Sequence, residues 1–79
     1  MTEQDLKQIK LEGLEVAKES FNEARNSSDC DVCGGEDETD FIYNGKTYSV
    51  SWEGYWEGSM YFDYKIFGNN IDINAKHQY

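Results

Sequence analysis

The strongest constraint on the fold is the alternation of apolar and polar residues through residues 41–76. A period of two is typical of a strand with one face in a core and the other in solvent. The alternating runs are separated by Asn44-Gly45, by residues 53–58 and by residues 68–70. Asn-Gly is a strong signal for a tight hairpin turn. We therefore expect an antiparallel meander of four strands, because sequential hairpins need no crossover connection.

The alternation also assigns a core to the predicted sheet. Aromatic rings should supply much of it, since a chain of 79 residues holds four Phe, six Tyr and two Trp but few aliphatic residues. Residues 53–58 are expected to form a connection, and residues 76–79 a fraying tail. The inward-facing set is expected to be Tyr48, Val50, Trp52, Met60, Phe62, Tyr64, Ile66, Ile71, Ile73 and Ala75.

Residues 3–25 are predicted to form one amphipathic helix, because their apolar residues gather on one face at the helical period. Thr2 suits the N-cap, with Asp5 three residues later. Gly13 lies in the middle of the apolar face, where Gly costs about 1 kcal/mol relative to Ala. We therefore expect an aromatic ring of the sheet to approach the helix closely at Gly13. The apolar face is Leu6, Ile9, Gly13, Val16, Ala17, Phe21 and Ala24.

Together these patterns predict an α+β fold with one N-terminal helix packed on a four-stranded antiparallel β-meander. The chain is expected to be a single domain of residues 1–79, since its length is near the lower limit for one hydrophobic core.

Acidic residues gather in two places, of which the second carries six units of the net charge of −9. One is a stripe along one flank of the predicted helix, whose other flank is basic. The second is segment 27–40, which has no apolar periodicity and is expected to be an acidic connecting loop. A solvated helix flank with no partner also explains the stripe. The candidate partner-binding carboxylates are Glu12, Glu15, Glu19 and Glu23 in the stripe, and Asp29, Asp31, Glu36, Asp37, Glu38 and Asp40 in the loop.

Cys30 and Cys33 form a C-x-x-C-G motif, which resembles a zinc knuckle whose two thiolates turn toward the metal. A zinc site needs four ligands, and His77 is the chain's only histidine. The same spacing serves thioredoxin-like redox chemistry, where the motif opens a helix in a βαβ unit. Three interpretations stay open: two reduced cysteines, a metal site, or a disulfide or redox switch. We predict no resident metal or cofactor.

No other pattern indicates catalysis. The single His has no Ser or Cys near it in sequence, and the carboxylates lie in polar segments that would not raise their pKa values. We therefore predict that the protein is not an enzyme. Tyr55 and Trp56 are candidate interface anchors, because exposed aromatic residues beside charges are enriched in protein interfaces. The alternative is that Trp56 folds back over the end of the core.

The charge also argues against direct binding to nucleic acid, whose phosphates are neutralised by Lys and Arg. No apolar run is long enough to span a membrane and no signal peptide begins the sequence, so we expect a cytoplasmic protein. Attraction should be toward a basic, nucleic-acid-processing protein. The stripe places carboxylates about 6 Å apart along the helix, a scale comparable with backbone phosphates.

The favoured prediction is therefore a small acidic inhibitor that occludes a basic nucleic-acid-binding protein. Its character is that of a phage or mobile-element counter-defence protein, such as an anti-CRISPR or anti-restriction DNA mimic. The alternatives are a zinc-binding or redox-sensing module that uses the C-x-x-C motif, or an accessory subunit of a larger complex. Pairing of two copies into a homodimer also stays open.

Overall fold

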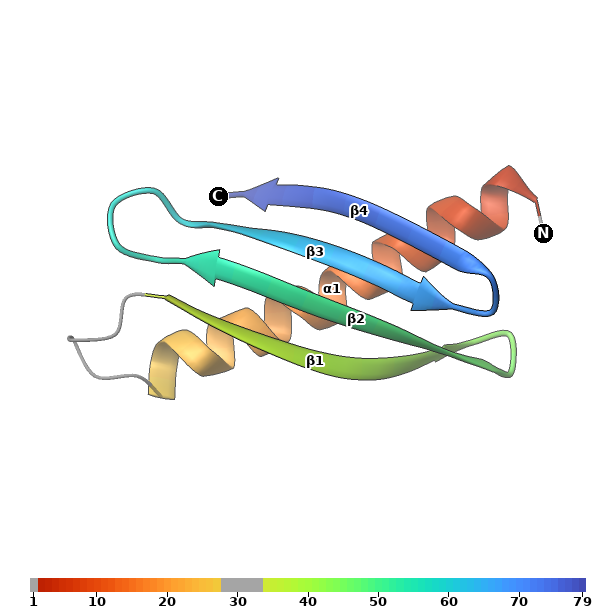
Figure 1. Ribbon diagram of the computed structural model, residues 1–79, viewed down its shortest axis with the longest axis horizontal. Coiled ribbons are helices and arrows are strands. Elements are labelled where there is room, and N and C mark those ends of the chain that lie inside the picture. The colour runs from red at the N-terminus through yellow and green to blue at the C-terminus, as the bar shows by residue number, and fades with distance from the viewer. Residues whose placement is uncertain (1, 28–33) are drawn as a thin grey trace.

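The computed structural model describes residues 2–27 and 34–79, which form one helix on one face of a four-stranded sheet (Figure 1). Every neighbouring pair of strands is antiparallel, and the strand order β1-β2-β3-β4 follows the sequence. The predicted α+β meander is confirmed. The elements are α1 (Glu3–Ser27), β1 (Gly34–Tyr43), β2 (Lys46–Tyr55), β3 (Tyr61–Gly68) and β4 (Ile71–Gln78).

The helix begins with the predicted cap. The Asp5 backbone N–H donates to Thr2 Oγ1 and the Thr2 backbone N–H donates to Asp5 Oδ2, both at 3.2 Å. This reciprocal pair satisfies donors that the first turn of a helix leaves without intrahelical partners. The other Asp5 oxygen accepts a hydrogen bond of 2.9 Å from the Tyr43 hydroxyl. The helix start is thereby joined to the end of β1.

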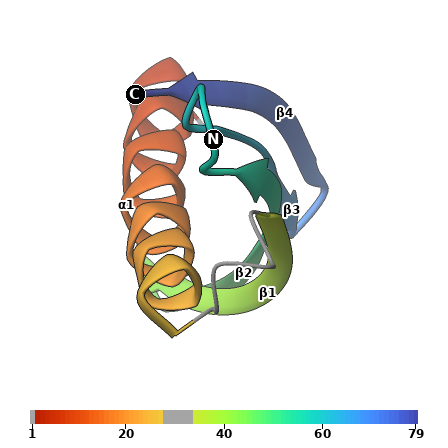
Figure 2. The ribbon, with the colours of Figure 1, turned by 90° about the vertical axis from the view of Figure 1, so that its left-hand side faces the viewer.

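The core lies between α1 and the inner face of the sheet, which bends around the helix (Figure 2). The inward residues of β2 and β3 are buried as the alternation predicts. Those of β4 are only half-buried, because α1 lies mainly against β1, β2 and β3. Leu6, expected on the apolar face, is 37% exposed near the helix start. The buried side chains are Ile9, Ala17, Phe21, Tyr48, Val50, Trp52, Phe62, Tyr64 and Ile66.

Gly13 marks the closest approach of helix and sheet, but the neighbour is chiefly aliphatic. A Cβ at this position would contact Ile66 Cδ1, and would lie 2.8 Å from Ile66 Cγ1 and 3.4 Å from Phe41 Cε1. The expected aromatic ring is therefore present as the second neighbour. Ile66 comes first because it lies on the inner face of β3, one of the two inner strands, and is fully buried.

The sheet starts earlier than the alternation predicts. Residues 34–40, expected as part of a loop, form the first seven residues of β1 and pair with β2 from Tyr55 to Ser49. Pairing overrides the low strand propensity of Asp and Glu, because edge-strand carboxylates can face water while the backbone completes the ladder. The predicted hairpin at Asn44-Gly45 is confirmed, with φ of 51° and 74° at its two residues, as a type I′ turn requires.

The connection after β2 is also shorter than expected, since β2 continues through Tyr55. Gly54 lies within this strand, opposite Phe62 of β3. A Cβ at this position would be 2.6 Å from Phe62 Cβ, so only glycine permits β2 and β3 to approach this closely. The chain end is ordered rather than frayed. β4 extends through Gln78, and the Tyr79 N–H donates to the Met60 carbonyl at 2.9 Å.

Candidate protein-binding surface

The acidic stripe of α1 faces solvent over most of its length. Glu15, Glu19 and Glu23 are exposed, whereas Glu12 is half-buried. Glu15 forms an ion pair of 3.5 Å with Lys18, and the Glu15 side chain remains 71% exposed. Within residues 2–27 and 34–79, no cation lies within 4 Å of Glu19 or Glu23. The stripe is therefore available to an external cation.

The carboxylates of β1 divide between the two faces of the sheet. Glu36, Glu38 and Asp40 lie on the outer face, opposite Glu53, Ser51 and Ser49 of β2. Asp37 faces inward, opposite Trp52. Asp40 is held by a hydrogen bond of 2.7 Å from the Ser49 hydroxyl to its Oδ1.

One row of the outer face brings three carboxylates together. Glu36 lies opposite Glu53 on β2, Glu53 lies opposite Asp63 on β3, and Asp63 lies opposite Lys76 on β4. Like charges directly opposite each other are destabilising, so the two pairs that Glu53 makes have a cost in the isolated protein, which Lys76 offsets only at the Asp63 end. A bound cation would relieve that repulsion.

The fold brings the helix stripe to the β1 edge of the sheet, with the stripe on the inner side of that edge and Glu36, Glu38 and Asp40 on its outer face. The Ser20 hydroxyl of α1 donates to Asp37 Oδ2 at 3.2 Å, and Trp52 Nε1 donates to Ser20 Oγ at 2.8 Å. At the other end, Tyr43 is bonded to Asp5. The helix therefore runs in the direction opposite to β1 and crosses the strands obliquely (Figure 1). Together they form the acidic surface, defined here as Glu12, Glu15, Glu19, Glu23, Glu36, Asp37, Glu38 and Asp40.

Between the helix and β1 lies an apolar notch, which the sequence analysis did not identify. Leu11 is 57% exposed and Ile42 is 70% exposed within it. Glu12 Oε2 is buried and has no hydrogen-bond partner among the described residues. The available signals were two apolar residues out of phase with their elements: Leu11 lies off the apolar helix face, and Ile42 points to the outer face. The apolar notch is lined by Gln8, Leu11, Glu12, Glu15, Val16, Phe41 and Ile42.

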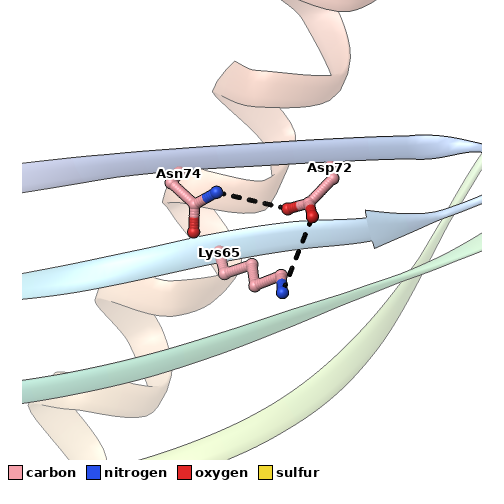
Figure 3. A network of polar contacts seen from close by, with 3 residues as sticks. All are labelled: Lys65, Asp72 and Asn74. Carbon is pink, nitrogen blue, oxygen red and sulfur yellow. Dashed lines mark hydrogen bonds and ion pairs between the residues drawn. The ribbon is translucent and has the colours of Figure 1, made fainter.

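The outer face of β3 and β4 carries both signs of charge. Lys65 Nζ lies 3.7 Å from Asp72 Oδ2, and Asn74 Nδ2 donates to Asp72 Oδ1 at 3.3 Å (Figure 3). Lys76 Nζ lies 4.3 Å from the centre of the Tyr61 ring. These contacts compensate charge within the protein, so this half of the face offers less to an external cation.

Tyr55 and Trp56 have separate environments. Tyr55 is 49% exposed at the end of β2, with its ring centre 5.7 Å from that of Tyr61. Trp56 is half-buried, and its ring packs edge-on against Phe21 with 5.5 Å between centres. Trp56 therefore folds back over the end of the core, which was one of the two expected outcomes. Tyr55 is the more exposed candidate anchor.

Several predicted residues lie outside the part of the chain that the structure describes. They are Asp29, Asp31, Cys30 and Cys33. His77, considered as a zinc ligand, has its ring against Phe62 and Tyr79, with centre distances of 5.4 and 4.7 Å. In residues 2–27 and 34–79, no three side chains of His, Cys, Asp or Glu are grouped as a metal site requires. The same residues include no helix with the length and apolar character of a membrane span.

Comparison of the chain with protein-family models, with curated proteins and with solved structures finds no significant match.

Proposed function

We propose that this protein is an acidic protein-binding module that occludes a basic nucleic-acid-binding protein. One observation carries the proposal: the carboxylates of α1 and of β1, far apart in sequence, lie side by side around one edge of the sheet. Most of them are exposed. A surface of one sign attracts partners of the opposite sign and raises their rate of association.

The spacing of these carboxylates supports a nucleic-acid-like surface. Along the helix the stripe advances about 6 Å per four residues. Along β1 the outer-face residues Glu36, Glu38 and Asp40 are about 7 Å apart, since alternate residues of a strand share a face. Two adjacent rows of negative charge offer Lys and Arg side chains contacts similar to those with two phosphate backbones. The inhibitor would then compete with nucleic acid for the same basic site.

Mimicry of this kind suits a phage or mobile-element protein that blocks a host defence enzyme, such as a restriction or CRISPR effector. The protein would act in the cytoplasm, where those enzymes meet their nucleic-acid targets. It would need no catalytic group and no direct contact with nucleic acid. The net charge of −9 over 79 residues supports strong attraction to a basic partner.

Capture followed by competition tests this proposal. The full chain is immobilised, bacterial lysate is passed over it, and bound protein is eluted with salt. We expect a nucleic-acid-binding protein that elutes at high salt, because salt screens exposed charges. Duplex DNA should displace the captured protein, since both ligands would use one site on it.

Two matched variants decide whether the acidic surface is responsible. Replacing Glu15, Glu19 and Glu23 by Gln should abolish capture and leave the fold intact, because these side chains are exposed. Replacing Lys7, Lys10 and Lys18 by Gln, on the opposite helix flank, should leave capture unchanged or stronger. Equal capture by the native chain and the Glu→Gln variant, or a partner that DNA does not displace, would overturn the proposal.

A further inference from the structure

β1 has a free edge. It pairs with β2 on one side, and no described strand pairs with its other side. The strand is 10 residues long. A free edge presents backbone donors and acceptors to any extended chain that lies beside it. β1 contains neither proline nor lysine, and the charges that protect its edge against pairing are all carboxylates, with Asp37 on the inner face.

The charges on both sides of this edge have the same sign. Glu36, Glu38 and Asp40 lie on the outer face of β1, and the helix stripe lies on the inner side. Side chains of a strand added at this edge would alternate between these two sides. Lys or Arg at alternate positions would therefore lie opposite the outer carboxylates, an arrangement that stabilises cross-strand pairs.

A second copy of the chain is the less favourable occupant. Two β1 strands paired edge to edge would place the carboxylates of one copy beside those of the other. Like charges opposite each other destabilise such a pair. The charge of the edge thus selects a basic segment over a second copy.

The apolar notch gives the edge a second feature. It lies beside the Phe41–Ile42 end of β1, where Leu11 and Ile42 expose apolar surface. Burial of that surface by an apolar side chain would stabilise a complex. The buried Glu12 oxygen in the apolar notch lacks a hydrogen-bond partner, and a donor from the bound segment would satisfy it.

We propose that the free edge of β1 binds an extended basic segment of the partner protein as a fifth strand. In this complex, Lys or Arg side chains face the β1 carboxylates and one apolar side chain fills the apolar notch. The inference rests on the proposed function, and it names the element of the partner that is recognised: an extended stretch with a basic residue at every second position.

The test uses the full chain and a fluorescent synthetic peptide that alternates lysine with valine. Two further peptides carry N-methyl groups on backbone amide nitrogens. One is methylated at the backbone nitrogens of two lysines, and the other at those of two valines. In a strand, alternate N–H groups point to opposite edges. One methylated peptide should therefore bind as the parent does, and the other about thirtyfold more weakly, since two lost backbone hydrogen bonds correspond to about 2 kcal/mol. If charge alone attracted the peptide, the two methylated peptides would bind with equal affinity.

Two measurements on the protein locate the binding. The double variant Leu11→Ala, Ile42→Ala should bind the parent peptide about tenfold more weakly, because apolar contact in the notch is lost. Leu6→Ala, which changes an exposed residue outside the apolar notch, should bind normally. Amide hydrogen exchange of β1 should slow when the peptide binds, because its free N–H groups gain partners.

Equal binding of the two methylated peptides, or slowed exchange along β4 in place of β1, would overturn the fifth-strand proposal. Those results would leave the proposed function standing if the Glu→Gln variant still loses its captured partner. Failure of the proposed function would instead show as capture that is insensitive to the helix carboxylates. The two outcomes are therefore distinguishable.

Discussion

The two edges of the sheet differ in charge and in packing. β1 carries four carboxylates and no Lys or Arg, and its inner face lies against α1. β4 carries Asp72 and Lys76, its inward residues are half-buried, and it has little contact with α1. The strand with uncompensated charge is thus the strand that the helix holds in place. A fixed row of charges needs no reordering when a partner binds, which favours affinity.

Truncation of one side chain at each edge tests the difference in packing, and gives the largest expected effect. Phe41→Ala on β1 should lower the free energy of unfolding by about 3 kcal/mol, because the ring packs beside Gly13 and against Tyr48. Ile73→Ala on β4 should cost only about 1 kcal/mol, since its site is half-buried and away from the helix. Urea unfolding measures both. Equal losses would contradict the view that α1 anchors β1 more firmly than β4.

Charge removal at each edge tests the difference in electrostatics. Neutralising Glu36, Glu38 and Asp40 to their amides should weaken binding of the lysine–valine peptide about tenfold, as three exposed pairs of about 0.5 kcal/mol each would. The matched control replaces Lys65 and Lys76 by Gln on the β3–β4 half of the face. That variant should bind at least as tightly as the native chain. A loss of affinity from the lysine variant equal to that from the acid variant would remove the distinction between the edges.

The chain end supports the β4 side, and its removal should have a smaller effect. The Tyr79 ring stacks on Phe21 with 5.7 Å between centres, although Tyr79 remains 52% exposed. Tyr79→Ala should therefore cost about 1 kcal/mol, from partial loss of apolar burial and ring contact. Gln78→Ala, at an exposed neighbour, should change stability little. Identical melting temperatures for Tyr79→Ala and the native chain would mean that the tail frays after all.

Alternation was sufficient to predict the architecture, because the buried residues of β2 and β3 repeat at a period of two. It failed for the first part of β1, where the sequence is almost wholly polar. Strand formation there depends on pairing with β2, a long-range contact that residue types in segment 34–40 do not encode. The alternation failed again at the chain end, where aromatic contacts across the core hold Tyr79 against Phe21.

The candidate site was predictable in composition but not in arrangement. Helical periodicity identifies the acidic stripe on α1, and charge density identifies the carboxylates near β1. That these two groups lie together follows from contacts such as Ser20 with Asp37, which join residues 17 positions apart. The apolar notch was missed for the same reason, since Leu11 and Ile42 become neighbours only when the helix packs beside β1.

The smallest expected effect on stability concerns the hydrogen bond from Tyr43 to Asp5, which joins the start of the helix to the end of β1. The Thr2 backbone N–H and then the Tyr43 hydroxyl hold the pKa of Asp5 below its ordinary value of 3.8. Its stabilising contribution is therefore present above about pH 4 and lost as the pH falls through the lowered folded-state pKa. The hydrogen bond to Asp5, then burial, raises the pKa of Tyr43 above 10.0. That contribution is present below pH 10 and lost as the pH rises through the raised value.

Substitutions at Asp5 and Tyr43 separate the loss of stability at low pH, called here the acidic limit, from the loss at high pH, called the alkaline limit. Tyr43→Phe keeps the ring and removes the hydroxyl, so it should remove the alkaline limit and retain part of the acidic one, which Thr2 also supports. Asp5→Asn should remove the acidic limit, because no carboxylate remains to titrate, and should reduce the alkaline limit, to which burial of the Tyr43 hydroxyl also contributes. Melting temperature recorded against pH measures each curve. An alkaline limit of the same size in Tyr43→Phe and the native chain would show that this bond does not anchor β1.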